Sequence, residues 1–209
     1  MIYYPICFNT ENKKILVVGG GKAALLKINS LLNTSAEITV ISKDFSFDTS
    51  EFKKEYKNLN FIKDNFEINK IKTEYDMAFI CTDNTKLNTE IREFFKHKKT
   101  IVMSADNKKE SDFITSAIIQ KENITISVNT QGKSPTAAKL ILNEIEKLLT
   151  EDFTEKINLV CKIRELLLKE KEVNSNINIK DIMDSLNLKS NRELMDIIND
   201  IKDKRYTGD

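Results

Sequence analysis

Three consecutive glycines near the start of the chain stand between an apolar run and a stretch of small residues. Within Val17–Ala24, the residues Gly19, Gly21 and Ala24 fit the G-x-G-x-x-A form of the dinucleotide-binding fingerprint. Gly19 allows a tight turn, Gly21 lets the backbone approach a pyrophosphate, and Ala24 permits close packing of a helix on a strand. The pattern predicts a phosphate site at the start of a helix, where free N–H groups favour negative charge.

The flanking segments make this fingerprint more specific than its glycine spacing alone. Lys14–Val18 indicates a buried strand, Lys22–Leu32 has apolar residues at helical spacing, and Glu37–Ile41 indicates a second, β-branched strand. A strand, a glycine turn, a helix and a strand in this order are typical of a unit that binds a nicotinamide dinucleotide. The residues expected to bind the cofactor at the turn are Gly19, Gly21, Lys22 and Ala23.

The end of the second strand of such a unit usually carries an acid that binds the ribose. Here this position holds Ser42, Lys43 and Asp44. Asp44 suits the ribose hydroxyls, whereas Lys43 would tolerate a 2′-phosphate. Both residues are therefore expected to contact the cofactor, and NAD is favoured over NADP by a small margin.

Strands and helices continue to alternate beyond this unit. Further strands are expected at Leu59–Ile62, Met77–Cys81 and Thr100–Met103, with a helix at Thr85–Phe95 between the last two. Such alternation predicts a parallel sheet with right-handed crossovers. Ligands of these sheets bind beyond the carboxyl ends of the strands, at the point where the strand order reverses.

The pattern changes after residue 112. Two β-rich runs, Phe113–Gln120 and Ile124–Asn129, are joined by a hairpin-length connection. A helix over residues 134–149 then begins with Ser134 as its N-cap and proline at its first position. The hairpin alternates too little to face water, so we expect a second copy of the chain to cover its apolar residues.

From Thr150 onward the chain has helical period and is rich in charged residues and asparagine, with Asn174–Asn178 as the expected flexible joint. The predicted fold class is α/β. We expect a Rossmann-type parallel-sheet domain over residues 1–112, a β-hairpin and helix dimerisation segment over 113–149, and a small helical C-terminal domain over 150–209.

Charge and composition argue against several function classes. The net charge of +1 does not favour binding to nucleic acid or membranes through bulk charge. Cys7, Cys81 and Cys161 are far apart, and His97 lies among lysines, so neither a disulfide framework nor a metal site is expected. Without a signal-like start or an apolar run of membrane-spanning length, the protein is expected to be cytoplasmic.

Several motifs, in order along the chain, resemble the N-terminal module of sirohaem synthases. They are Tyr4-Pro5-Ile6, VVGGGKAALLK, Thr82-Asp83 with Leu87-Asn88, Ser104-Ala105-Asp106, SDFITSAII and NTQGKSP. This family comprises precorrin-2 dehydrogenases, some of which are also sirohydrochlorin ferrochelatases. The resemblance covers about residues 2–149, and no methyltransferase domain is expected because the chain ends at Asp209.

The resemblance implies the oxidation of precorrin-2 to sirohydrochlorin with NAD+ as the hydride acceptor, in a homodimer formed through the hairpin region. Ferrous iron, or cobalt in a corrinoid branch, is a candidate second substrate, and the sequence leaves this open. Asp106 inherits the role of the catalytic aspartate, and a carboxylate there can act as a general base. Thr82 and Asp106 both follow strand ends, which places Thr82 among the expected cofactor contacts.

The implied tetrapyrrole carries many carboxylates, so its pocket should present cations and helix N-termini. The residues expected to bind it are Thr130, Lys133 and Ser134. Asp83, by contrast, is expected to cap the helix that begins at Thr85.

A rival hypothesis is a transcriptional regulator that senses a dinucleotide. Residues 179–188 and 191–201 indicate two short helices with a tight connection, as in a helix-turn-helix. The second helix spreads acids over its surface, which would make phosphate contacts scarce. A helical cap over the tetrapyrrole pocket is the favoured role for this tail, and a regulatory subunit without chemistry remains a third alternative.

Overall fold

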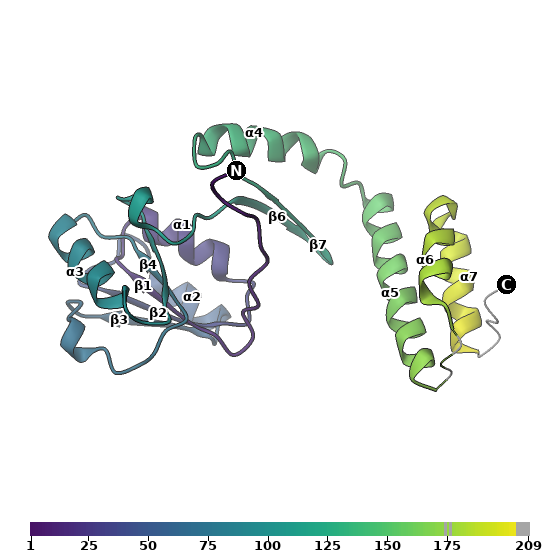
Figure 1. The fold of residues 1–209 in the computed structure, drawn as a ribbon, viewed down its shortest axis with the longest axis horizontal. Helices are drawn as coiled ribbons and strands as arrows, with labels where there is room; N and C mark the ends of the chain where they lie inside the picture. Colours follow the sequence, from purple (N-terminus) through teal and green to yellow (C-terminus); the bar gives the residue numbers. More distant parts are fainter. Residues whose placement is uncertain (174, 176, 204–209) are drawn as a thin grey trace. The chain divides into compact units, whose positions relative to one another are not determined.

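Alternate residues of the first strand are buried on opposite faces of a sheet, and this pattern organises the N-terminal part of the molecule. The computed structural model describes residues 1–173, 175 and 177–203, and the chain divides into two units, Met1–Thr115 and Ser116–Asp209 (Figure 1). In the first unit, β1 (Lys14–Val18) is central, and its four last residues are all buried. The apolar run predicted as a buried strand is therefore confirmed.

Five parallel strands form the sheet of the first unit in the order β3-β2-β1-β4-β5. The chain moves outward from β1 through β2 (Glu37–Ser42) to β3 (Leu59–Lys63), then returns to the other side of β1 as β4 (Met77–Ile80) and β5 (Ile101–Ser104). The strand order thus reverses between β1 and β4. This is the doubly wound arrangement expected from the sequence, with its switch point beside the glycine turn.

Helices on opposite faces of the sheet cover the two sets of β1 side chains. Helix α1 (Lys22–Leu31) buries Ala24 and Ile28 with Ile15 and Val17. Helix α3 (Thr85–Phe95) instead buries Ile91 and Phe95, in the core that contains Leu16 and Val18. Since successive residues of a strand face opposite sides of the sheet, this packing explains why the last four residues of β1 are all apolar.

A short helix that the sequence patterns did not indicate, α2 (Thr49–Glu55), lies between β2 and β3. It has no fully buried residue and is capped by Asp48, which accepts a hydrogen bond from Ser50 N. Its packing relies on Phe52, whose ring contacts the rings of Phe47 and Phe61. A single apolar contact of this kind gives no helical period to read in the sequence.

The second unit begins with an antiparallel hairpin, β6 (Ala117–Lys121) and β7 (Ile124–Val128). Helix α4 (Pro135–Glu146) follows, capped as predicted by Ser134, whose Oγ accepts a hydrogen bond from Ala137 N at 3.1 Å. The strand predicted to begin at Phe113 begins four residues later. The physical reason is that Asp112 pairs with Val102 at the edge of β5, and the Phe113 ring packs against Phe79 in the first unit.

The expectation that the hairpin alternates too little to face water was wrong. Along both strands, partly buried residues alternate with exposed ones, and the exposed set consists of Ile118 and three polar residues, Gln120, Thr125 and Ser127. Helix α4 of the same chain packs on both strands. Intrachain packing therefore supplies part of the cover that we had assigned to a second copy.

Three helices complete the second unit: α5 (Glu151–Val173), α6 (Ile179–Ser185) and α7 (Asn191–Lys202). Their apolar faces share one core, which includes Ile163, Leu167, Ile182 and Leu194. Residues 174 and 176 of the predicted flexible joint lie outside the described residues. Within the described part of the chain, none of the helices has the length and apolar character needed to cross a membrane.

Candidate functional site

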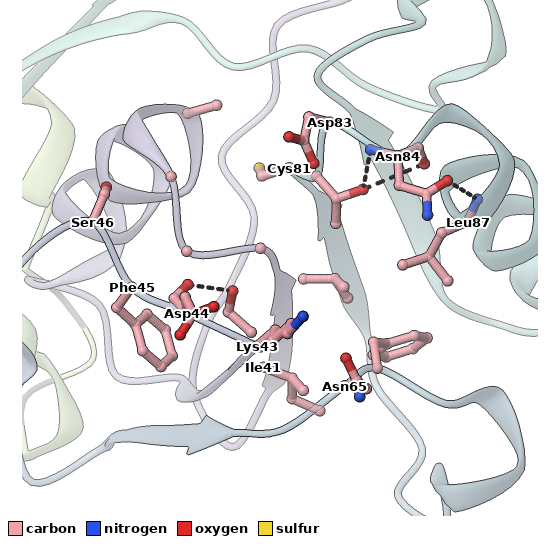
Figure 2. A pocket seen from close by; sticks show the side chains of 18 of the residues that line it. Ile41, Lys43, Asp44, Phe45, Ser46, Asn65, Cys81, Asp83, Asn84 and Leu87 are labelled. Atoms are coloured by element: carbon pink, nitrogen blue, oxygen red, sulfur yellow. Dashed lines mark hydrogen bonds between the residues drawn. The ribbon is translucent and has the colours of Figure 1, made fainter.

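A cleft of about 730 Å³ lies at the carboxyl ends of β1, β2 and β4 in the first unit (Figure 2). Its walls come from the turn after β1, the segments after β2 and β3, and the segment after β4. All seven residues expected to bind the cofactor line it: Gly19, Gly21, Lys22, Ala23, Lys43, Asp44 and Thr82. The tertiary structure therefore brings together residues that are spread over about 60 positions of the sequence.

Two glycines of the turn are required by the neighbouring backbone. Gly19 has a φ of 120°, and a Cβ there would lie 2.4 Å from the carbonyl oxygen of Cys81. A Cβ on Gly20 would lie 2.1 Å from the carbonyl oxygen of Asp44. Because these neighbours are backbone atoms, they cannot rotate away. Sequence reasoning had assigned no role to Gly20, and only the approach of residue 44 explains it.

Gly21 differs from both, because a Cβ built on it would meet no atom within 4 Å. Protein packing therefore does not account for a glycine at this position, whereas a phosphate group approaching the backbone would. Gly21 is also the N-cap of α1, and no side chain caps that helix end. The first N–H groups of α1 are thus oriented for an anion, and the turn fits the pyrophosphate of a dinucleotide.

The segment after β2 forms the second wall of the cleft. Ser42 Oγ donates to the carbonyl oxygen of Asp44 at 2.6 Å within this loop, and Ser46 N donates to the carbonyl oxygen of Gly20 at 2.8 Å, which joins the loop to the glycine turn. The Asp44 carboxylate is 74% exposed and lies 3.3 Å from Lys63 Nζ. Asn65 and Phe66, which follow β3, also line the cleft, although the sequence patterns did not identify them.

The segment after β4 forms the third wall. Thr82, Asp83 and Asn84 line it, and Asn84 caps α3 by accepting a hydrogen bond from Leu87 N at 3.1 Å. The expectation that Asp83 caps this helix was wrong by one residue. Since the side chain of Asn84 reaches the helix start, Asp83 remains at the cleft surface (Figure 2).

Asp106 does not line this cleft but is joined to its rim through one side chain. Asn88 Nδ2 donates to Asp106 Oδ2 at 2.9 Å and to the carbonyl oxygen of Thr82 at 3.1 Å. The Thr82 hydroxyl donates to Asn88 Oδ1 at 2.5 Å. Asn88 is fully buried. It belongs to one of the motifs that resemble sirohaem synthases, but the sequence patterns indicated no role for it.

The carboxylate of Asp106 accepts further hydrogen bonds on Oδ1. Ser104 Oγ donates to it at 2.5 Å and Arg92 Nη1 at 3.4 Å. Burial raises the pKa of Asp106, but the hydrogen bonds from Ser104 and Asn88 and the charge of Arg92 outweigh it, so this pKa lies below its ordinary value. The carboxylate is therefore ionised at neutral pH and can serve as a proton acceptor.

Cys81 also lines the cleft, at the end of β4, but its environment keeps the thiol protonated. Burial raises the pKa of Cys81 to about 11, although the positive charge of Lys27 acts in the opposite direction. The thiolate is the nucleophilic form of cysteine. Cys81 is thus a packing residue at neutral pH, and all three cysteines of the chain carry free thiols.

The residues expected to bind the tetrapyrrole lie in the second unit, in the turn before α4. Thr130 Oγ1 donates to the carbonyl oxygen of Ser134 and accepts from Ser134 N, both at 2.9 Å. Lys133 N donates to the carbonyl oxygen of Thr130 at 3.0 Å. The hydroxyls of Thr130 and Ser134 thus build the turn and the helix cap, and substrate contact by these residues stays a prediction.

Comparisons with known proteins agree with this geometry. Residues 6–117 match the family described as putative NAD(P)-binding. The chain is 33% identical to a siroheme synthase of Ruthia magnifica over 177 residues, which are 85% of this chain and 36% of that protein. It is 26% identical to the precorrin-2 dehydrogenase of Bacillus subtilis over 163 residues, 77% of this chain and 97% of that protein. The chain spans about a third of the length of the curated siroheme synthases it matches.

The fold also has a solved counterpart. The structure of SirC, precorrin-2 dehydrogenase, superimposes with a TM-score of 0.73 at 18% sequence identity, covering 96% of this chain and 99% of that one. Sheet, turn and cleft define a dinucleotide-binding protein of the Rossmann type. Within this class, the chain belongs to the sirohaem synthase N-terminal module family, through the putative NAD(P)-binding domain that residues 6–117 match.

Proposed function

We propose that the protein oxidises precorrin-2 to sirohydrochlorin with NAD+ as the oxidant. The observation that carries this proposal is an ionised carboxylate, Asp106, linked through Asn88 to the rim of a dinucleotide cleft. The reaction removes one hydride and one proton from the tetrapyrrole and yields NADH. Two relatives, a siroheme synthase and a precorrin-2 dehydrogenase, support this substrate class.

A nicotinamide cofactor, when bound, supplies the acceptor for the hydride. The chain itself supplies the phosphate site at Gly19, Gly21, Lys22 and Ala23, and the ribose wall at Lys43 and Asp44. NAD is the proposed cofactor because Asp44 can accept hydrogen bonds from both ribose hydroxyls, whereas a 2′-phosphate would meet its negative charge. Lys43 lines the same cleft and reduces this preference.

Asp106 is the proposed acceptor for the proton, which leaves the tetrapyrrole as the hydride departs. Its carboxylate holds no proton at neutral pH, so it is ready to receive one. Thr130, Lys133 and Ser134 are the proposed contacts for substrate carboxylates, since Ser134 caps the N-terminus of α4 and Lys133 adds a cation.

Anaerobic mixing of the purified protein with precorrin-2 and NAD+ tests this function. We expect NADH absorbance to appear together with the spectrum of sirohydrochlorin. Absence of turnover with both NAD+ and NADP+ would refute the proposal. A parallel reaction that adds ferrous iron or cobalt to sirohydrochlorin tests chelation. The ionised Asp106 is the proposed acceptor of the two pyrrole protons one at a time, with the first released to solvent before the second is accepted.

A homodimer is also proposed, and the surface of the second unit supports it. Helix α4 exposes Leu140 at 63% and Ile141 at 46%, and β6 exposes Ile118 at 50%. Exposed large apolar side chains on adjacent elements are typical of a protein interface. Light scattering at micromolar concentration should give twice the chain mass, and a monomer would contradict this proposal.

No observation favours the regulator hypothesis. Helix α7, which corresponds to the expected recognition helix, buries Leu194, Ile197 and Ile198 in the core of the helical tail. Its exposed residues include Asp196 and Asp200, which would repel phosphates.

A further inference from the structure

A fully buried asparagine connects the ends of β4 and β5. Asn88 lies in the first half of α3, and both ends of its amide are engaged by Thr82 and Asp106. The reversed amide would place its oxygen against the Asp106 carboxylate and its nitrogen against the Thr82 hydroxyl proton. The network therefore fixes one orientation of this side chain.

An arginine on the same helix approaches the other oxygen of Asp106. The Arg92 side chain is only 11% exposed, and its Nη1 donates to Ser104 Oγ at 3.0 Å as well as to Asp106 Oδ1 at 3.4 Å. Its Nη2 donates to Thr89 Oγ1 at 2.9 Å. Since Arg92 contacts several partners, it can lock the Ser104 hydroxyl toward the carboxylate while contributing its own charge.

The charge of Arg92 is shared with a second acid. Arg92 Nε lies 2.8 Å from Glu110 Oε2, in a short turn after β5, but it is not aligned for a hydrogen bond with any group in the described part of the chain. Asp106 and Glu110 thus face the same guanidinium from one side of the sheet. The arginine thus places one positive charge between two carboxylates, and its charge lowers the pKa of Asp106.

We propose that Asn88, Arg92 and Ser104 are positioning residues that hold the Asp106 carboxylate in one orientation, and that Asn88 fixes it relative to Thr82 at the cleft rim. The inference rests on the proposed function, because it takes Asp106 as the proton acceptor. A proton acceptor and a hydride acceptor must be held in a defined relation to act on the same substrate. A single rigid amide between Asp106 and the cleft provides this relation, and buried packing limits its movement.

A purely structural role for these residues predicts a different result from a positioning role. If they only satisfy buried polar groups, their loss lowers stability without changing the protonation of Asp106. If they hold the carboxylate, their loss also raises the pKa of Asp106 toward or above its ordinary value, because hydrogen bonds from Asn88 and Ser104 and the charge of Arg92 favour the ionised form.

Direct titration of Asp106 separates these two outcomes without any need for turnover. The full chain, labelled with ¹³C at aspartate carboxyl groups, is titrated by NMR, and Asp106→Asn assigns the signal. We expect the Asp106 midpoint to move to higher pH in Asn88→Ala and Arg92→Gln, and to move less in Arg92→Lys. Lys96→Gln, at the exposed end of the same helix, is the matched control and should leave the midpoint in place.

Kinetics give the second readout. Asn88→Ala and Arg92→Gln should lower kcat roughly 10- to 100-fold with little change in KM for NAD+. The acid limb of the kcat/KM profile should move to higher pH in Arg92→Gln. If Asn88→Ala does not fold, the two Arg92 variants decide the question, because Arg92 is less completely buried than Asn88.

Unchanged Asp106 midpoints in folded Asn88→Ala and Arg92→Gln would overturn the inference. If the wild type fails to oxidise precorrin-2, the proposed function falls instead, and the NMR midpoints alone decide whether these residues hold the carboxylate. The failure of one proposal is thus distinguishable from the failure of the other.

Discussion

The glycine turn after β1 and the carboxylate cluster at the ends of β4 and β5 lie at the same edge of one sheet, but they are built from different atoms. The turn presents backbone N–H groups, and its shape depends on missing Cβ atoms. The cluster, formed by Asn88, Arg92, Ser104 and Asp106, presents side chains that contact one another. The turn is therefore sensitive to added atoms, and the cluster is sensitive to lost hydrogen bonds.

Removing the negative charge of Asp106 from the cluster should have the largest effect on activity. Asp106→Asn keeps the size of the side chain but can no longer accept a proton, so kcat should fall roughly 10²- to 10⁴-fold. Binding of NAD+, measured by calorimetry, should stay within about twofold of wild type, since Asp106 does not line the cleft. Near-normal turnover would remove Asp106 from its proposed role, and lost NAD+ binding would show that the two sites are not separable.

Adding one methyl group to the turn should give the next largest effect, and the position should decide its kind. Gly19→Ala is expected to destabilise the fold by roughly 2–5 kcal/mol, because a left-handed φ and a backbone clash coincide. Gly21→Ala has room for its Cβ, so its free energy of unfolding should fall by only about 0.5–1 kcal/mol, because alanine is a poorer N-cap than glycine.

The two variants form a matched pair, measured by urea unfolding and by titration with NAD+. Gly21→Ala should remain folded while losing dinucleotide affinity, since the added methyl occupies space proposed for phosphate. Unchanged NAD+ affinity in Gly21→Ala would place the pyrophosphate elsewhere. Equal stability losses in both variants would contradict the distinction between packing and binding glycines.

The ribose wall should give a smaller effect. Asp44→Ala should weaken NAD+ about 10- to 100-fold through lost hydrogen bonds to a charged acceptor, and NADP+ much less. Lys43→Ala is the matched control and should weaken NADP+ more than NAD+. Dissociation constants for both cofactors check this pair, and a tighter complex of wild type with NADP+ than with NAD+ would reverse the proposed preference.

Lowering the pH should give the smallest effect, and this effect is on the free energy of unfolding rather than on activity. A carboxyl whose pKa is lower in the folded than in the unfolded state stabilises the fold above the unfolded pKa, and this contribution is lost as pH falls through the folded value. Burial raises the pKa of Asp106, but its hydrogen-bond donors and Arg92 lower it further, so wild type should lose more stability than Asp106→Asn on acidification below about pH 4. Parallel stability curves for the two proteins would contradict the lowered pKa.

Much of the secondary structure of the first unit could be predicted from the sequence. The buried strand Lys14–Val18 and the helix Thr85–Phe95 were predicted with the bounds observed, since four consecutive apolar residues and an apolar helical stripe are strong local signals. The start of the strand predicted at Phe113 was harder to predict from the sequence. The segment that follows β5 and the segment that starts the hairpin are both rich in residues that favour strands. Only the contacts of Asp112 and Phe113 show that these two residues pack with the first unit.

The dinucleotide turn can be predicted from the sequence alone, because its requirements are local: a strand, glycines at fixed spacing and a helix start within about a dozen residues. The roles of Gly20, Asn88 and Arg92, by contrast, depend on the tertiary structure. Gly20 is constrained by a carbonyl 24 positions away, and Asn88 acts through Asp106, 18 positions away. Such relations arise where parallel strands end at one edge, so they depend on the strand order rather than on any local pattern.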